Sequence, residues 1–271
     1  MNSYVTTLTC LFLITTTTLA QSWSYQGSPA SVGKGNIATL STEVWSALSN
    51  PAGLGISPAF SVGVQHEQRY LMPELGIDVL AASFPVFGGG LGFYLSNTGL
   101  GTYGENRAGF AMGRQLSKAV SIGGSIDFFL LRTPAGYPNS WAISGNVGIC
   151  AKPTENLLLG VYISNVSFSH FNNEAADPLP VVMNMGIGYK VLDNLLLCAE
   201  VEKDILMPLR VKGGAEYFPV KSVALRAGVL SAPFESRFGI GFIYRRYHID
   251  FAMKEHAILG WSPQCAITVI F

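Results

Sequence analysis

The chain has 271 residues, of which 49% are hydrophobic and only 13% charged, and its 17 Lys and Arg residues balance its 17 Asp and Glu residues. Zero net charge gives no electrostatic reason to expect a nucleic-acid partner. The mean hydropathy of +0.33 is typical of a membrane protein, yet after the first 20 residues no apolar run is long enough for a spanning helix. These features favour a β-barrel, whose strands hide their hydrophobicity by alternation.

The first segment has the pattern of a secretory signal peptide. Its apolar stretch runs from Leu8 to Leu19 and ends at small residues, with Ala20 before Gln21. Its opening residues lack Lys and Arg, but the alternative, an uncleaved anchor helix, fits a run so short and rich in threonine less well. We therefore predict a signal peptide at residues 1–20.

Residues 21–57 precede the first expected strand and contain one helical pattern. In "STEVWSALSN", Ser41 or Thr42 can cap a helix. The apolar side chains of Val44, Trp45 and Leu48 would then share one side. The sequence thus predicts a short amphipathic helix ahead of the barrel.

The motif "NPAGLG" follows this helix directly. Pro51 disfavours helical geometry at Asn50, and the glycines Gly53 and Gly55 permit a sharp change of direction. A large barrel is too wide to be filled by its own wall side chains, and many such barrels carry a plug. We expect the segment to plug the periplasmic mouth, with Asn50, Pro51, Ala52, Gly53 and Leu54 leading from the plug into the wall. The alternative is a stub packed on the rim.

Residues 58–271 divide into segments of about ten residues that alternate apolar and polar side chains, as barrel strands do. In "VSIGGSIDFFL", for example, Ile126 and Phe128 share one face, whereas Ser125 and Asp127 share the other. We predict an all-β fold, a transmembrane antiparallel up-and-down barrel of about fourteen strands. A soluble β-sandwich also alternates, but its polar face should be richer in charge. The expected strands are 59–67, 74–85, 90–97, 106–115, 119–132, 140–151, 156–168, 180–191, 194–203, 207–218, 222–231, 235–245, 247–255 and 262–271.

The connectors between these segments alternate in length. Short links such as "VLDN" and "PVKS" alternate with longer ones such as "RTPAGYPNS" and "SHFNNEAADPLP". Short periplasmic turns and long external loops are typical of outer-membrane barrels. The final strand alternates and ends in Phe271, which resembles the terminal strand that the barrel assembly machinery recognises. The expected location is therefore the outer membrane of a Gram-negative bacterium.

Several charged residues fall on the polar, inward face of the later strands. Opposite charges on neighbouring strands can pair inside the lumen. One interpretation is a polar track or ligand site, and the other, which we favour because the signs balance, is a ladder of ion pairs that stiffens the barrel. The residues concerned are Glu200, Glu202, Arg210, Lys212, Glu216, Arg226, Arg245, Asp250 and Lys254.

The sequence contains little that could support catalysis. A hydrolase would need a nucleophile, a histidine and an orienting partner, but the chain has only four histidines, and His248 is expected to point inward beside Asp250. The cysteines that remain after signal cleavage, Cys150, Cys198 and Cys265, have neither disulfide nor zinc spacing. We expect no enzyme activity, no metal and no cofactor.

The motif "SNPAGLG" ahead of the first strand resembles the N-terminal signature of FadL-like barrels, and it is closer to the PorV/PorQ-type proteins of Bacteroidetes. Further similar stretches lie at 148–167, 178–191 and 213–229. The resemblance implies a fourteen-stranded outer-membrane barrel. PorV-like members work with a type IX secretion translocon, and FadL members pass long-chain fatty acids.

Two functions follow from this resemblance. The first is an accessory or adaptor barrel in type IX secretion, with secretion-system proteins as partners. The second is a passive channel or transporter for small hydrophobic compounds. The mature chain leaves little room for long outer loops or a large hatch, and this economy favours the first function.

Overall fold

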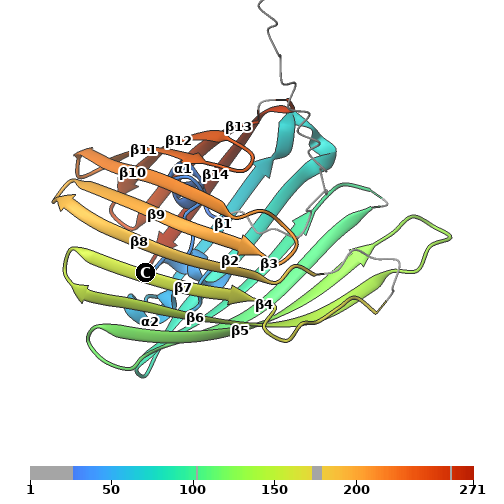
Figure 1. Cartoon of the computed structure of the whole chain (residues 1–271), viewed down its shortest axis with the longest axis horizontal. Coiled ribbons are helices and arrows are strands. Elements are labelled where there is room, and N and C mark those ends of the chain that lie inside the picture. The colour runs from blue at the N-terminus through green and yellow to red at the C-terminus, as the bar shows by residue number, and fades with distance from the viewer. Residues whose placement is uncertain (1–26, 102, 173–178, 257) are drawn as a thin grey trace, which may run out of the picture.

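The structure, a computed structural model, describes residues 27–101, 103–172, 179–256 and 258–271. These residues form a closed antiparallel barrel in which each strand pairs with the next one along the chain (Figure 1). The predicted signal peptide lies outside the described residues. The strands are β1 (Ser61–Gln68), β2 (Gly76–Val86), β3 (Gly89–Thr98), β4 (Gly104–Gln115), β5 (Val120–Arg132), β6 (Ser140–Thr154), β7 (Leu157–Ser164), β8 (Val182–Leu192), β9 (Leu195–Asp204), β10 (Arg210–Val220), β11 (Val223–Leu230), β12 (Glu235–Tyr244), β13 (Tyr247–His256) and β14 (Gly260–Ile270).

The barrel is closed by pairing between its first and last strands. Val62 in β1 lies opposite Val269 in β14, and the same register continues along both strands. The terminal residue adds to this junction, because the ring of Phe271 stacks on that of Phe60 with 4.8 Å between their centroids. The backbone N–H of Phe271 also donates to the carbonyl oxygen of Phe60. The predicted fold class, a barrel of fourteen strands, is confirmed.

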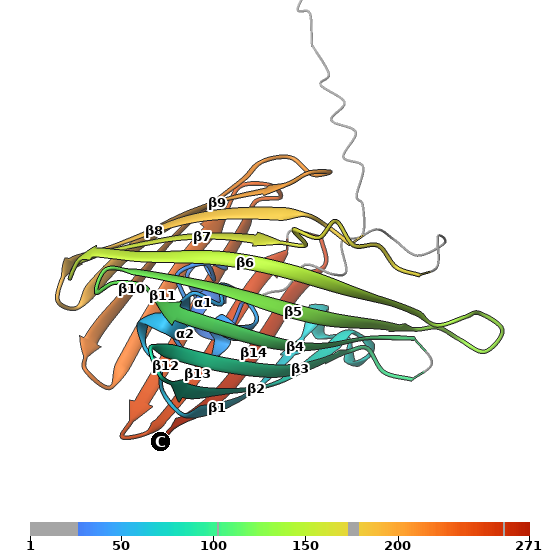
Figure 2. The same cartoon turned by 90° about the horizontal axis from the view of Figure 1, so that it is seen from below.

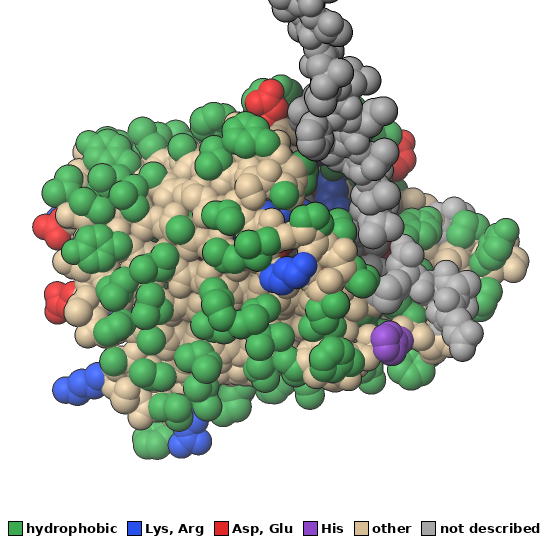
Figure 3. Space-filling model, viewed as in Figure 1, with side chains coloured by type: hydrophobic (Ala, Val, Ile, Leu, Met, Phe, Trp, Pro, Cys, Tyr) green, Lys and Arg blue, Asp and Glu red, His purple; other side chains and the backbone are tan. Residues whose placement is uncertain are grey.

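The alternation in the sequence becomes the two faces of the wall. In β5, Ile126 and Phe128 are exposed on the outside, whereas Ser125 and Asp127 are buried on the inside. Figure 3 shows hydrophobic side chains covering one side of the barrel wall. Such a surface would be costly in water and is favourable in lipid. The polar side chains that face the lumen are covered by neighbouring residues and not by solvent.

The two ends of the barrel differ in the length of their connections. At one end are short turns, such as the two-residue link between β12 and β13 at Arg245 and Arg246. The other end carries the longer loops, among them the connection between β7 and β8, and a long β5–β6 hairpin projects there (Figure 2). The C-terminus lies at the short-turn end (Figures 1 and 2), as the predicted alternation of connectors requires.

Inside the barrel lie residues 27–57, which we call the luminal segment. It contains α1 (Pro29–Gly33), the 3-10 turn η1 (Val44–Ala47) and α2 (Gly53–Ile56). α1 contacts strands β11 to β14, and α2 contacts β3 to β6. Two further 3-10 turns, η2 (Arg69–Leu71) and η3 (Pro73–Leu75), belong to the loop after β1. Within the described residues, no helix is long and apolar enough to cross a membrane.

The local structure of the luminal segment differs from the prediction in two respects. Neither Ser41 nor Thr42 caps a helix, because η1 begins after Glu43 and has no side-chain cap. The glycines of "NPAGLG" do not make a flexible turn, since Gly53 and Gly55 are part of α2. They are required for close packing instead. A Cβ on Gly53 would lie 2.0 Å from the carbonyl oxygen of Ser41.

Candidate functional site

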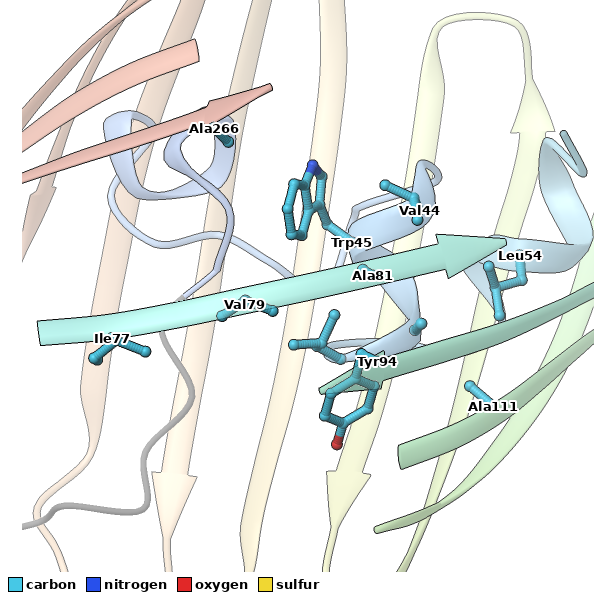
Figure 4. Close-up of a cluster of buried hydrophobic side chains, with 11 residues drawn as sticks. Val44, Trp45, Leu54, Ile77, Val79, Ala81, Tyr94, Ala111 and Ala266 are labelled. Atoms are coloured by element: carbon cyan, nitrogen blue, oxygen red, sulfur yellow. The ribbon is translucent and has the colours of Figure 1, made fainter. Parts of the chain in front are cut away.

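The luminal segment is seated against one side of the barrel by Trp45. The side chain is only 1% exposed and belongs to a buried apolar cluster with Leu48, Leu54 and residues of the wall (Figure 4). Its indole Nε1 donates a hydrogen bond of 3.1 Å to the hydroxyl of Thr268 in β14. The ring lies where the side chain of Gly63 would be, because a Cβ there would come within 2.6 Å of it.

Asn50 joins the luminal segment to strand β6. Its amide Nδ2 lies 3.0 Å from the carbonyl oxygen of Thr39 within the segment and 3.2 Å from the carbonyl oxygen of Ile149 in β6. The same nitrogen lies 3.2 Å from the sulfur of Cys150, which is a buried free thiol facing the lumen. Its Oδ1 accepts from the backbone N–H of Ala52. The carboxamide therefore fixes the chain at the start of the NPAGLG motif.

The rest of the motif packs directly on the backbone of the wall. Pro51 and Ala52 are fully buried, and the hydroxyl of Ser121 in β5 donates 2.7 Å to the carbonyl oxygen of Ala52. A Cβ on Gly123, also in β5, would lie 2.3 Å from the backbone nitrogen of Ala52. Leu54 is 3% exposed and touches β3 through Gly90. Such contacts leave no space for water between motif and wall.

Glycines on the inner face recur wherever the luminal segment approaches the wall. A Cβ on Gly148, for instance, would lie 2.0 Å from Oδ1 of Asn50. Because only a residue without a side chain tolerates this approach, these positions define the seat of the segment. Further inward glycines that contact it closely include Gly92, Gly113, Gly160, Gly214, Gly228 and Gly239.

The later strands carry the expected ion pairs. All of the predicted charges except Arg245 lie on the inner face and form ion pairs, either between neighbouring strands or, for Arg226 with Asp250 and Lys254 with Glu67, across one intervening strand. In order around the barrel, the pairs are Glu202 with Arg210 at 2.9 Å, Glu202 with Lys212 at 2.6 Å, Glu200 with Lys212 at 2.7 Å, Glu216 with Arg226 at 2.6 Å, Arg226 with Asp250 at 2.5 Å, and Lys254 with Glu67 at 2.8 Å. The sign balance seen in the sequence is thus a balance of direct contacts.

Arg245 is the exception, and its placement in the predicted ladder is wrong. It occupies the tight turn between β12 and β13 with a positive φ of 54° and lies over the ring of Tyr244 rather than in the lumen. The prediction ran the strand alternation one residue too far. The turn needs both arginines, so the alternation ends at Tyr244.

The network also reaches into the luminal segment, which the sequence did not predict. Nζ of Lys34 lies 3.2 Å from Oε2 of Glu216. The buried ammonium of Lys212 donates to the carbonyl oxygen of Asn36, and the backbone N–H of Thr39 donates to Oε2 of Glu200. The charges of the wall therefore hold the segment as well as one another.

A second charged cluster, also missed, surrounds Asp127 in β5. The carboxylate is fully buried and accepts hydrogen bonds from Tyr94, Arg107 and Asn146. The guanidinium of Arg107 also lies 5.1 Å from the ring centroid of Phe129. Alternation places Asp127 on the inner face, but pairing it with Arg107 requires the register of β4 against β5, which the sequence does not specify.

Between the two clusters lies a cavity of about 90 Å³, which we call the luminal chamber. Residues of the luminal segment, including Asn36 and Thr39, line it on one side, and Leu179 lines it from the β7–β8 connection. The remaining wall comes from strands β4 to β10, with Arg107, Phe129, Ser144, Asn146, Tyr162, Ser164, Val182, Asn184, Glu200, Glu202 and Lys212 among its lining side chains.

Comparison with known proteins relates this architecture to outer-membrane channels. No protein-family model and no curated sequence matches the chain. Several solved structures, however, are similar to it. The toluene transporter TbuX of Ralstonia pickettii aligns at 14% identity over 90% of this chain and 97% of its own, with a TM-score of 0.62. The monoaromatic hydrocarbon channel CymD aligns at 13% identity over 90% and 97%, with a TM-score of 0.67.

A FadL homologue of Pseudomonas aeruginosa is also similar, at 11% identity over 92% of this chain and 99% of its own, with a TM-score of 0.58. These structures support the FadL-like part of the resemblance drawn from the sequence, and none of them bears on the PorV/PorQ part. At such low identity the likeness concerns the fold. The chain has the fold of the FadL-like outer-membrane channels.

Proposed function

We propose that the protein is a FadL-like channel or transporter of the outer membrane, through which small compounds pass a lumen that the luminal segment narrows. The observation that carries this proposal is the seating of residues 27–57 inside a closed barrel, through Trp45 on one side and ion pairs on the other.

The fold supports the second of the two functions expected from the sequence. The structures named above are described as a toluene transporter, a monoaromatic hydrocarbon channel and a FadL homologue. Small hydrophobic compounds are accordingly the first class of substrate to test. The other expectation, an adaptor role in type IX secretion, receives no support from these comparisons and stays a prediction from the sequence resemblance alone.

The proposal is tested by reconstituting the mature chain and a variant lacking residues 21–50 into planar bilayers and toluene-loaded liposomes. We expect low conductance and measurable toluene release from the intact protein, and higher conductance from the deletion variant, because removing the segment opens the lumen. Both proteins must first show the heat-dependent gel mobility of a closed barrel. Silence of both folded proteins in both assays would contradict the proposal.

A further inference from the structure

The luminal chamber contains a buried polar side chain that lacks a partner. Asn184 in β8 is 9% exposed and faces the chamber between Tyr162 in β7 and Glu202 in β9. Among the described residues, its carboxamide oxygen Oδ1 has no hydrogen-bond partner. Buried polar groups of native proteins are nearly always satisfied, by the protein, by water or by a ligand. The unpaired oxygen therefore marks the point in the chamber where water or a guest molecule with a donor group can bind.

The charges that line the chamber indicate that the guest is neutral. Lys212 is held between Glu200 and Glu202, and Arg107 is held by Asp127. Each charged side chain lining the chamber thus already has an opposite charge in contact. An ionic guest would have to break one of these buried pairs, which is costly in a confined lumen.

The remaining lining is polar on some sides and apolar on others. The amide of Asn146 already donates to Ser125 and Asp127, so Oδ1 of Asn184 is the polar group left for a guest. Phe129, Leu179 and Val182 offer apolar surface. A plain hydrocarbon would leave the Asn184 amide without a partner. A fully polar guest would place polar groups against the apolar side chains, where they find no hydrogen-bond partner. The lining therefore fits a molecule that carries a hydroxyl or amide group beside a short apolar part.

The volume sets the size of that molecule. The chamber measures about 90 Å³, whereas an apolar cavity of about 150 Å³ is known to hold benzene. An aromatic ring would need the lining to move. A guest with a few carbon atoms fits the chamber as it stands.

We infer that the luminal chamber binds small neutral alcohols and amides, with Asn184 as the residue that recognises their polar group. If the protein is the channel proposed above, compounds that carry a hydroxyl or amide group should be better substrates than plain hydrocarbons. This part of the inference rests on the proposed function. The binding itself does not depend on passage through the membrane.

The test is saturation-transfer NMR on the purified full-length barrel in detergent, with 1,2-propanediol as the probe and toluene and acetate as comparison probes. We expect a diol signal from the unaltered protein and no acetate signal. Asn184→Leu should weaken the diol signal about three- to tenfold, as the loss of one hydrogen bond predicts. It should not weaken the toluene signal, because toluene is too large for the chamber and can make no hydrogen bond to Asn184.

The matched control is Asn106→Leu, which removes an asparagine from β4 on the outer face, where it lies opposite Asn97 and Leu130. This variant should bind the diol like the unaltered protein. If Asn184→Leu does not fold, as judged by heat-dependent gel mobility, the smaller change Asn184→Ala takes its place with the same expected loss. A diol signal that is absent from the unaltered protein, or indifferent to Asn184, would overturn the inference and assign the chamber to water.

The bilayer assays separate this inference from the proposed function. A diol signal that depends on Asn184, combined with silence of the intact and deleted barrels in bilayers, would leave the binding site standing and refute the channel. Conduction, together with a diol signal that does not change in Asn184→Leu, would support the channel and refute the binding site.

Discussion

The luminal segment is held differently on the two sides of the barrel. Against β1 to β6 the contact combines close packing with uncharged hydrogen bonds. Trp45 fills the place beside Gly63, and Ala52 lies on Gly123 and accepts from Ser121. Against β9 to β13 the segment also meets fixed charges, as Lys34 pairs with Glu216. The first kind of contact tolerates no added atom, and the second tolerates no unpaired charge.

This difference shows what each side contributes. Close packing determines where the segment lies, because backbone-to-backbone contacts allow only one position. Buried ion pairs add little net stability but are costly to break singly. We expect single charge removals to destabilise the folded barrel most, and glycine substitutions to displace the segment while leaving the wall intact.

The largest effect is expected from Lys212→Met, which leaves Glu200 and Glu202 without their shared cation. Removing one member of a buried pair costs about 3–5 kcal/mol. The free energy of unfolding, measured by urea titration in detergent micelles, should fall by that amount. The double variant Lys212→Met/Glu200→Gln should recover part of the loss, and a single variant as stable as the unaltered protein would refute the role of this cluster.

Gly123→Ala should come next. The added methyl group would overlap the backbone of Ala52, and overpacking of this kind costs about 1–3 kcal/mol. We expect the luminal segment to shift, which raises bilayer conductance and exposes residues 27–57 to added protease. Gly124→Ala is the matched control, because the neighbouring glycine faces outward and its Cβ would lie 3.5 Å from the nearest atom. If Gly123→Ala and Gly124→Ala show the same conductance and the same sensitivity to protease, Gly123 does not help to position the luminal segment.

A smaller effect is expected from Trp45→Phe. Phenylalanine keeps most of the ring against Gly63 but cannot donate to Thr268. Loss of one buried hydrogen bond costs about 1 kcal/mol, whereas Trp45→Ala, which also empties the site, should cost about 3–5 kcal/mol. Urea unfolding of both variants would measure the two losses in the free energy of unfolding. Similar losses from both would show that the hydrogen bond, not the shape of the ring, anchors the segment.

The smallest effect should come from Arg245→Ala. The residue lies in the turn between β12 and β13 and takes no part in the luminal pairs. We expect its removal to change stability by less than about 0.5 kcal/mol, as at other surface positions. A loss of stability as large as that of Lys212→Met would show that Arg245 does take part in the luminal ion pairs.

Much of the wall could be predicted from the sequence, because a strand side chain has only two faces to choose from. Alternation placed Glu200 and Lys212 inside and Ile126 outside, and it set the number of strands. It failed only where a strand ended, as at Arg245.

The luminal segment could not be predicted in the same way. Its contacts are made by residues far apart in the chain, such as Asn50 with β6 and Trp45 with β14. Alternation places Gly123 on the inner face and Gly124 on the outer face, but an inward glycine that makes room for a neighbour looks in sequence like any other inward glycine, so the contact of Gly123 with Ala52 could not be predicted. The Asp127 cluster was missed for a related reason, since it needs the register between strands.

An engineered disulfide would show directly whether residues 27–57 lie inside the barrel. An ideal Cβ on Gly186 in β8 would lie 3.6 Å from the Cβ of Thr39, within the range of about 3.5–4.5 Å that a disulfide requires. The pair Thr39→Cys and Gly186→Cys is introduced after Cys150, Cys198 and Cys265 are replaced by serine, and Thr39→Cys with the outward-facing Ile187→Cys serves as control. We predict that the first pair forms a disulfide in intact membranes and that the control pair does not. Free thiols in both proteins would contradict it.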